Sequence, residues 1–82
     1  MKLSAEAESF LKKADMTTRE RIVRKLDSLS VNPRIGKPLT AKLKGFWSLR
    51  IGNYRAIYTI KDNELIVAVI TIGHRKNVYE RA

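Results

Sequence analysis

Two arginines in the second half of the chain flank a Gly-Asn pair: Arg50 lies two residues before Gly52, and Arg55 lies two residues after Asn53. A Gly-Asn pair between stretches of alternating apolar and polar residues is typical of a two-residue β-hairpin turn. Such a turn places Arg50 directly opposite Arg55, where two like charges repel each other. Because a guanidinium fork matches the oxygens of a phosphate, we predict a phosphate-binding site at this turn.

Three further residues with suitable chemistry follow the last apolar stretch: His74, Arg75 and Tyr79. If that stretch is a strand running back toward the same turn, these residues reach the two arginines. Arginines neutralise the charge that develops on a phosphate as it becomes pentacovalent, and an aromatic ring can hold an unstacked base. Histidine suits either proton transfer that RNA cleavage by the 2′-OH requires. The candidate catalytic residues are therefore Arg50, Arg55, His74, Arg75 and Tyr79.

Plainer interpretations exist for most of these side chains. A lone histidine beside a strand end, such as His74, is more often a surface or satisfied histidine than a catalyst, and Tyr79 is as easily read as a lid on the core. The remaining candidate phosphate ligands are lysines, for which the alternative is solubility of a loop; they are Lys37, Lys42, Lys44 and Lys76. On the second predicted helix, the cations read as an ordinary solvated face: Arg19, Arg21, Arg24 and Lys25. Only the Arg50–Arg55 pair is hard to explain without an anion.

Composition supports a polyanionic partner. The chain has 82 residues and a formal net charge of +9, which predicts a single domain, residues 1–82, that attracts nucleic acid first and an acidic protein second. It contains no cysteine, and the predicted cluster contains no Asp or Glu, so we expect neither a disulfide, a metal ion nor another cofactor. With no run of 18 apolar residues and no signal-peptide pattern, we expect a cytoplasmic protein without a membrane partner.

The elements that must position these residues follow from the period of the apolar positions. Ser4 predicts the cap of a first helix, and Thr17 to Glu20 fits a capping box that opens a second helix ending at Asn32-Pro33. Their apolar stripes comprise Leu3, Ala7, Phe10, Leu11 and Ala14, then Ile22, Val23, Leu26 and Leu29. Residues 34–45 read as a basic loop. A period of two then predicts strands over 46–51, 54–60 and 65–72, with Trp47, Tyr54 and Tyr58 facing the helices.

This order predicts an α+β domain, in which an N-terminal helical hairpin packs on a three- to four-stranded antiparallel sheet. Three segments carry a resemblance to a known family: Leu43-Lys44-Gly45, the run from Leu49 to Tyr58 (LRIGNYRAIY), and the run from Ile72 to Tyr79 (IGHRKNVY). With the helical hairpin, they resemble the toxins of the RelE/ParE superfamily over nearly the whole chain.

The resemblance implies roles for individual residues. Arg55 resembles the arginine that stabilises the transition-state phosphate, Arg75 the proposed general acid, and Tyr79 the tyrosine near the attacked nucleotide. Arg50 matches one of two lysines on the preceding strand of the best-known enzymes, and the other falls on Ser48, which is not basic. This departure leaves the general base open, and His74 is a candidate for that task.

A second departure concerns the N-terminus, where the family has an extended strand and only Met1 to Leu3 precede Ser4. We expect this first strand to be shortened or missing, which exposes a sheet edge to a partner chain.

The resemblance implies a toxin of a type II toxin–antitoxin system, held inactive by a cognate antitoxin. Its RelE branch cleaves mRNA in the ribosomal A site, in contact with ribosomal RNA, by metal-free 2′-OH attack. Two alternatives stay open: a ParE-like toxin that inhibits DNA gyrase, and a non-catalytic RNA-binding module.

Overall fold

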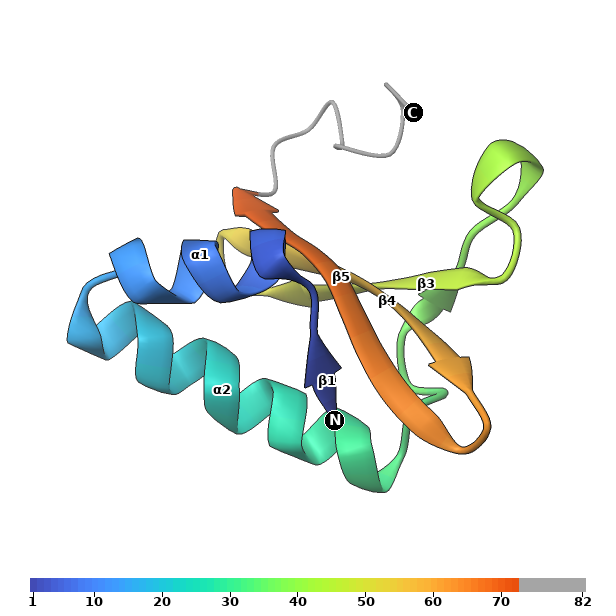
Figure 1. Cartoon of the computed structure of the whole chain (residues 1–82), viewed down its shortest axis with the longest axis horizontal. Helices are drawn as coiled ribbons and strands as arrows, with labels where there is room; N and C mark the ends of the chain where they lie inside the picture. The colour runs from blue at the N-terminus through green and yellow to red at the C-terminus, as the bar shows by residue number, and fades with distance from the viewer. Residues whose placement is uncertain (73–82) are drawn as a thin grey trace.

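Two helices form an antiparallel hairpin at the start of the chain (Figure 1). The structure, a computed structural model, describes residues 1–72. Helix α1 spans Ala5–Lys13, and the Oγ atom of Ser4 accepts a hydrogen bond of 3.0 Å from the Ala7 amide, which confirms the predicted cap. Helix α2 spans Met16–Val31 and ends at Asn32 as predicted.

The predicted cap of α2 was wrong. The helix begins at Met16, and the carboxylate of Asp15 accepts a hydrogen bond of 3.3 Å from the Thr18 amide. Thr17 lies inside the first turn. The positive end of the helix dipole also stabilises a carboxylate at the cap. Asp15 therefore provides both the capping hydrogen bond and the favourable charge, two residues before the Thr17 that the capping-box pattern indicated.

The sheet has five strands in the order β1-β5-β4-β3-β2. Their bounds are β1 Lys2–Leu3, β2 Lys37–Pro38, β3 Phe46–Ile51, β4 Tyr54–Lys61 and β5 Glu64–Ile72. Strand β1 pairs parallel to β5, and the other three pairs are antiparallel. The expected count of three to four antiparallel strands was too low. Strands β1 and β2 have only two residues each, which is too short for an alternating apolar pattern to predict them. The first strand is shortened but present.

The core lies between the hairpin and one face of the sheet (Figure 1). Its fully buried side chains come from both layers: Ala7, Ile22, Leu26, Leu29, Ala56, Tyr58 and Val67. The predicted helix-facing positions Trp47 and Tyr54 pack against this cluster, as expected. Val23, predicted to lie in the stripe of α2, is instead 36% exposed. It follows the buried Ile22 directly, and one residue turns the side chain about 100° around the helix axis.

Tyr58 fixes the short edge strand β2 from inside the core. Its hydroxyl donates to the Pro33 carbonyl at 2.8 Å and accepts from the Gly36 amide at 3.1 Å. A side chain at position 36 would collide with the Tyr58 hydroxyl, so this close approach requires glycine. Burial raises the pKa of the Tyr58 hydroxyl, and the hydrogen bond from Gly36 opposes that shift. Residues 33–38 are thereby held at the edge of the sheet.

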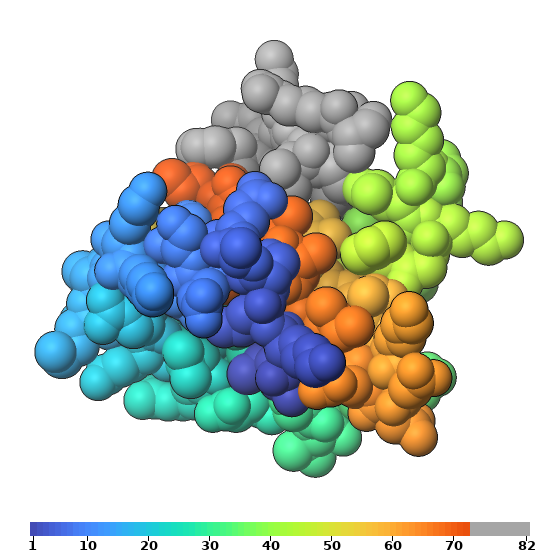
Figure 2. Space-filling view, viewed as in Figure 1, coloured from blue at the N-terminus to red at the C-terminus, as the bar shows by residue number. Residues whose placement is uncertain are grey.

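Residues 39–45 connect β2 to β3 and project from the body of the protein (Figure 2). The segment contains a short 3-10 helix, Ala41–Leu43, where a plain loop was expected. Along residues 1–72, no helix is long and apolar enough to cross a membrane.

Candidate active site

The β3–β4 hairpin has the predicted register. Ile51 pairs with Tyr54, Arg50 with Arg55, and Leu49 with Ala56. Gly52 has a φ of +61° and no positive φ occurs at Asn53, as a type II′ hairpin turn requires. The residues that alternate with the two arginines face the helices, so both arginines lie on the opposite face of the sheet. Arg50 is exposed, and its Nε atom donates to the Gly52 carbonyl at 3.4 Å, whereas Arg55 is partly buried.

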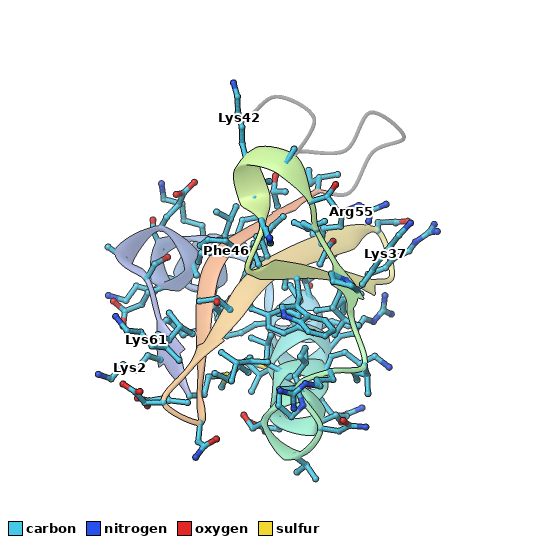
Figure 3. The ribbon with its side chains drawn as sticks, turned by 90° about the vertical axis from the view of Figure 1, so that its right-hand side faces the viewer. Lys2, Lys37, Lys42, Phe46, Arg55 and Lys61 are labelled. Carbon is cyan, nitrogen blue, oxygen red and sulfur yellow. The ribbon has the colours of Figure 1, made fainter. Side chains whose placement is uncertain are left out.

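A second row of residues crosses the same face beside the arginine pair. Lys37 pairs with Ser48, Ser48 with Ile57, and Ile57 with Val69, so these four side chains share a face. Lys37 is exposed at the edge strand, and Figure 3 labels it together with Arg55. Three cations from three strands therefore form what we call the basic face: Lys37, Arg50 and Arg55.

Ser48 occupies the centre of this second row. It is only 6% exposed, and within the described part of the chain its Oγ atom has no hydrogen-bond partner. A buried hydroxyl in this position can neither take a proton from a substrate nor carry charge. The ammonium group that Ser48 lacks is present on the directly opposite residue, Lys37.

The other predicted lysines of the loop lie apart from these rows. Lys42, in the 3-10 helix, points away from the body of the protein (Figure 3). Lys44 follows it and is also exposed. The structure therefore groups Lys37 with the arginines and leaves Lys42 and Lys44 on the projecting loop.

The remaining predicted site residues, His74, Arg75, Lys76 and Tyr79, lie outside the described residues. Strand β5 ends as predicted, with Thr71 opposite Arg55 and Ile72 opposite Tyr54. Their roles stay predictions.

Two arginines of α2 differ from the solvated face that we predicted. Arg19 closes the end of α1: its Nε atom donates to the Leu11 carbonyl at 2.9 Å, and an Nη atom donates to the Ala14 carbonyl at 2.8 Å. Arg21 reaches the β3–β4 turn, where a Cβ atom built on Gly52 would lie 3.1 Å from its Nη1 atom. No sequence signal separates Arg21 from Arg24, because both are exposed cations on the same helix.

Carboxylates are scarce around this turn. In residues 1–72, ion pairs within 4.0 Å involve only Glu64, which contacts the N-terminal amine and Lys2. Asp15 lines a shallow hollow with Phe10, Tyr54 and Ile72, but its carboxylate is engaged in capping α2. Over the same residues, His, Asp and Glu side chains form no group of three suited to a metal ion. The site thus presents guanidinium and ammonium groups to a ligand.

A helical hairpin on a mixed, mainly antiparallel sheet with this basic face is the arrangement expected of a small toxin of the RelE/ParE type. The structure of the RelBE2 toxin–antitoxin complex of Mycobacterium tuberculosis contains a chain with the same fold, at a TM-score of 0.78 and 29% identity over 87% of this chain and 86% of that one. The isolated RelE toxin of Escherichia coli superposes with a TM-score of 0.76 over 98% of this chain and 89% of its own, at 22% identity.

Residues 1–79 match the family described as "ParE toxin of type II toxin-antitoxin system, parDE", and the chain belongs to this family. Among curated relatives, Toxin RelG of M. tuberculosis is 42% identical over 58% of this chain, and mRNA interferase toxin RelE of E. coli is 34% identical over 87% of this chain and 79% of its own. The chain spans about half the length of the M. tuberculosis toxins RelG and RelE that it matches, 55% and 50%.

Proposed function

We propose that this protein is a ribosome-dependent mRNA endonuclease, and that a cognate antitoxin holds it inactive. The observation that carries the proposal is the direct opposition of Arg50 and Arg55 on the sheet face away from the helices, with Lys37 in the adjoining row. Like charges directly opposite each other on one face repel, and a bound phosphate would relieve that repulsion. A phosphodiester is the anion that fits both this geometry and the name of the E. coli relative, mRNA interferase toxin RelE.

The chemistry needs no metal ion. The 2′-oxygen of the RNA attacks the adjacent phosphorus, the bond from phosphorus to the 5′-oxygen breaks, and a 2′,3′-cyclic phosphate and a 5′-hydroxyl result. Negative charge builds on the non-bridging oxygens in the transition state, and Arg55 is placed to stabilise it. Arg50 and Lys37 hold the flanking backbone.

Two proton transfers accompany these steps, from the 2′-hydroxyl and to the 5′-oxygen. A guanidinium already carries its proton and has no free lone pair to accept another, so neither Arg50 nor Arg55 removes the first proton. Ser48 is excluded by its burial. We assign the base to His74, the general acid to Arg75, and stacking near the attacked nucleotide to Tyr79, with Lys76 as a phosphate ligand. Lys42 and Lys44, on the projecting loop, are assigned to ribosomal RNA.

Support for the antitoxin comes from the sheet edge. Strand β1 covers only Ile66 and Val67 of β5, so in the described chain the outer edge of β5 from Val69 to Ile72 has no strand beside it. An uncovered edge is a template for a partner strand. The M. tuberculosis relative with the same fold was solved as a toxin–antitoxin complex.

The test is induced expression of the wild-type chain, Arg55→Ala and Arg24→Ala, with growth and mapped mRNA 5′ ends recorded together. Arg24 is an exposed cation of α2 and controls for lost charge. We expect growth arrest with new 5′ ends at fixed codon positions for the wild type and Arg24→Ala. Arg55→Ala should lower cleavage on purified, mRNA-programmed ribosomes roughly 100-fold or more.

Arrest with intact mRNA would refute the nuclease. The family name makes DNA gyrase the next target to assay, by supercoiling in the presence of the purified chain. Ribosome binding without cleavage, equally strong in Arg55→Ala, would instead identify a non-catalytic RNA-binding module.

A further inference from the structure

The β3–β4 turn receives a cation from each layer of the fold. Arg50 of β3 donates to the Gly52 carbonyl at 3.4 Å, and the Arg21 guanidinium of α2 lies against the same glycine. Gly52 has no side chain to keep the two groups apart. One turn therefore brings a cation of the helical layer beside a cation of the basic face.

Within residues 1–72, no ion pair explains the position of Arg21. Among the described residues, no carboxylate lies within 4.0 Å of its guanidinium. The acids of α2 are elsewhere: Glu20 and Asp27 line a shallow hollow together with Arg24, and Arg21 is not part of it. Arg24 thus has carboxylates nearby, whereas Arg21 stands beside another cation.

The arrangement extends the cationic surface past the end of the sheet. Arg55 and Arg50 lie on the face away from the helices, and Arg21 reaches the same turn from the helical side. A polyanion that crosses the arginine pair toward the turn therefore meets Arg21 next. Because both guanidiniums lie against Gly52, one strand that crosses the arginine pair and passes the turn can reach both.

We propose that Arg21 binds the phosphate backbone of the RNA strand that Arg50 and Arg55 hold, at a nucleotide beyond the scissile phosphate. This inference rests on the proposed function and deepens it. Arg21 is a positioning residue. It extends the length of RNA that the protein binds and takes no part in bond making or breaking.

The experiment measures binding of the wild type, Arg21→Gln and Arg24→Gln to a 2′-O-methyl RNA of about 12 nucleotides, over a range of salt concentrations. The methyl group prevents cleavage. Each phosphate contact to a single strand adds about 0.7 to the slope of log affinity against log salt. We expect Arg21→Gln to reduce the slope by about that amount and Arg24→Gln to leave it unchanged. With an RNA of about three nucleotides, too short to reach Arg21, both variants should equal the wild type.

Three results would overturn the inference: equal slopes for Arg21→Gln and the wild type, equal losses for both variants, or an effect on ribosome binding with none on the free RNA. The last result would assign Arg21 to ribosomal RNA. A purely structural role would lower the melting temperature of Arg21→Gln without changing the slope, and Arg21→Lys, which keeps the charge, should restore the slope if the role is electrostatic. Cleavage in cells is read separately, so the proposed function can stand if this inference fails.

Discussion

The two turns at opposite ends of β4 differ in whether a described carboxylate lies beside their cations. At the β4–β5 turn, Asp62 and Asn63 both have positive φ, and Glu64 beside them contacts the N-terminal amine at 3.8 Å and the Lys2 ammonium at 3.9 Å. At the β3–β4 turn, Arg21 and Arg50 meet at Gly52 without a carboxylate within 4.0 Å in the described residues.

The difference teaches where to look for function on a strongly basic surface. With 17 Lys and Arg against 8 Asp and Glu, cations outnumber carboxylates about two to one, so a cation without a carboxylate beside it means little by itself. What distinguishes the β3–β4 end is geometry, because strands and a helix bring cations to one place.

Removing one positive charge at each end of the sheet should give the largest difference in RNA affinity between the two ends. Arg50→Gln and Lys61→Gln each remove one positive charge, and Figure 3 shows Lys61 at the end of the sheet away from Arg55. A hydrogen bond to a charged group contributes about 1.5–3 kcal/mol, so Arg50→Gln should weaken RNA binding at least about tenfold. Lys61→Gln should change affinity less than about twofold. Fluorescence anisotropy with the 2′-O-methyl RNA measures both, and equal losses would mean that only net charge matters.

A change in the core should disturb the third cation of the basic face without altering charge. Tyr58→Phe leaves the Pro33 carbonyl and the Gly36 amide without the hydroxyl, at a cost of about 1–3 kcal/mol of unfolding free energy. Urea denaturation measures this loss. Since the same hydrogen bonds hold β2, exchange of the Gly36 and Lys37 amides should rise more than exchange at the β3–β4 turn. A uniform rise would contradict the local role of Tyr58.

The paired charges at the β4–β5 end should contribute less. Glu64→Gln removes both contacts with Glu64, whose side chain is 41% exposed, and surface ion pairs contribute about 0–1 kcal/mol. We expect a small loss in melting temperature that vanishes at high salt, and unchanged RNA binding. A loss above about 2 kcal/mol would show that this end is structurally indispensable.

The smallest effect concerns Asp15, the carboxylate at the cationic end. Hydrogen bonds from the Thr18 side chain and amide lower the pKa of Asp15 below 3.8. A lowered pKa in the folded state contributes stability above the unfolded value, and that contribution is lost as the pH falls through the folded value. Asp15→Asn keeps a cap but cannot titrate, so its melting temperature should fall less than that of the wild type below about pH 4. Parallel pH profiles would contradict this assignment.

The hairpin that carries the arginine pair was predictable because its signals are local. A Gly-Asn pair fixes the turn, the turn fixes the register, and the register places Arg50 opposite Arg55. The helices were predictable for the same reason, apart from the cap, where Asp15 competed with a formally better pattern at Thr17.

The rest depends on contacts between residues far apart in sequence. Strand β2 is held by Tyr58, 22 residues after Gly36, and no pattern in Lys37-Pro38 announces that contact. The Arg19 side chain turns toward α1, and the Arg21 side chain turns toward the β3–β4 turn. The sequence does not distinguish the two, because both are arginines of the same helix. Lys37 was predicted as a phosphate ligand, but its place opposite Ser48 required the sheet.

The strand order also determines which parts of the sheet can form early during synthesis of the chain and which must form late. Strand β5 lies between β1 and β4, so the N-terminal strand has no partner until residues 64–72 have been synthesised. The β3–β4 hairpin closes through neighbouring residues and can form earlier, but the core that supports it also needs Leu65, Val67 and Ile70. Structure that depends on contacts between residues far apart in sequence forms slowly. The core beneath the arginine pair is therefore completed only after residues 64–72 have been synthesised, whichever part of the sheet forms first.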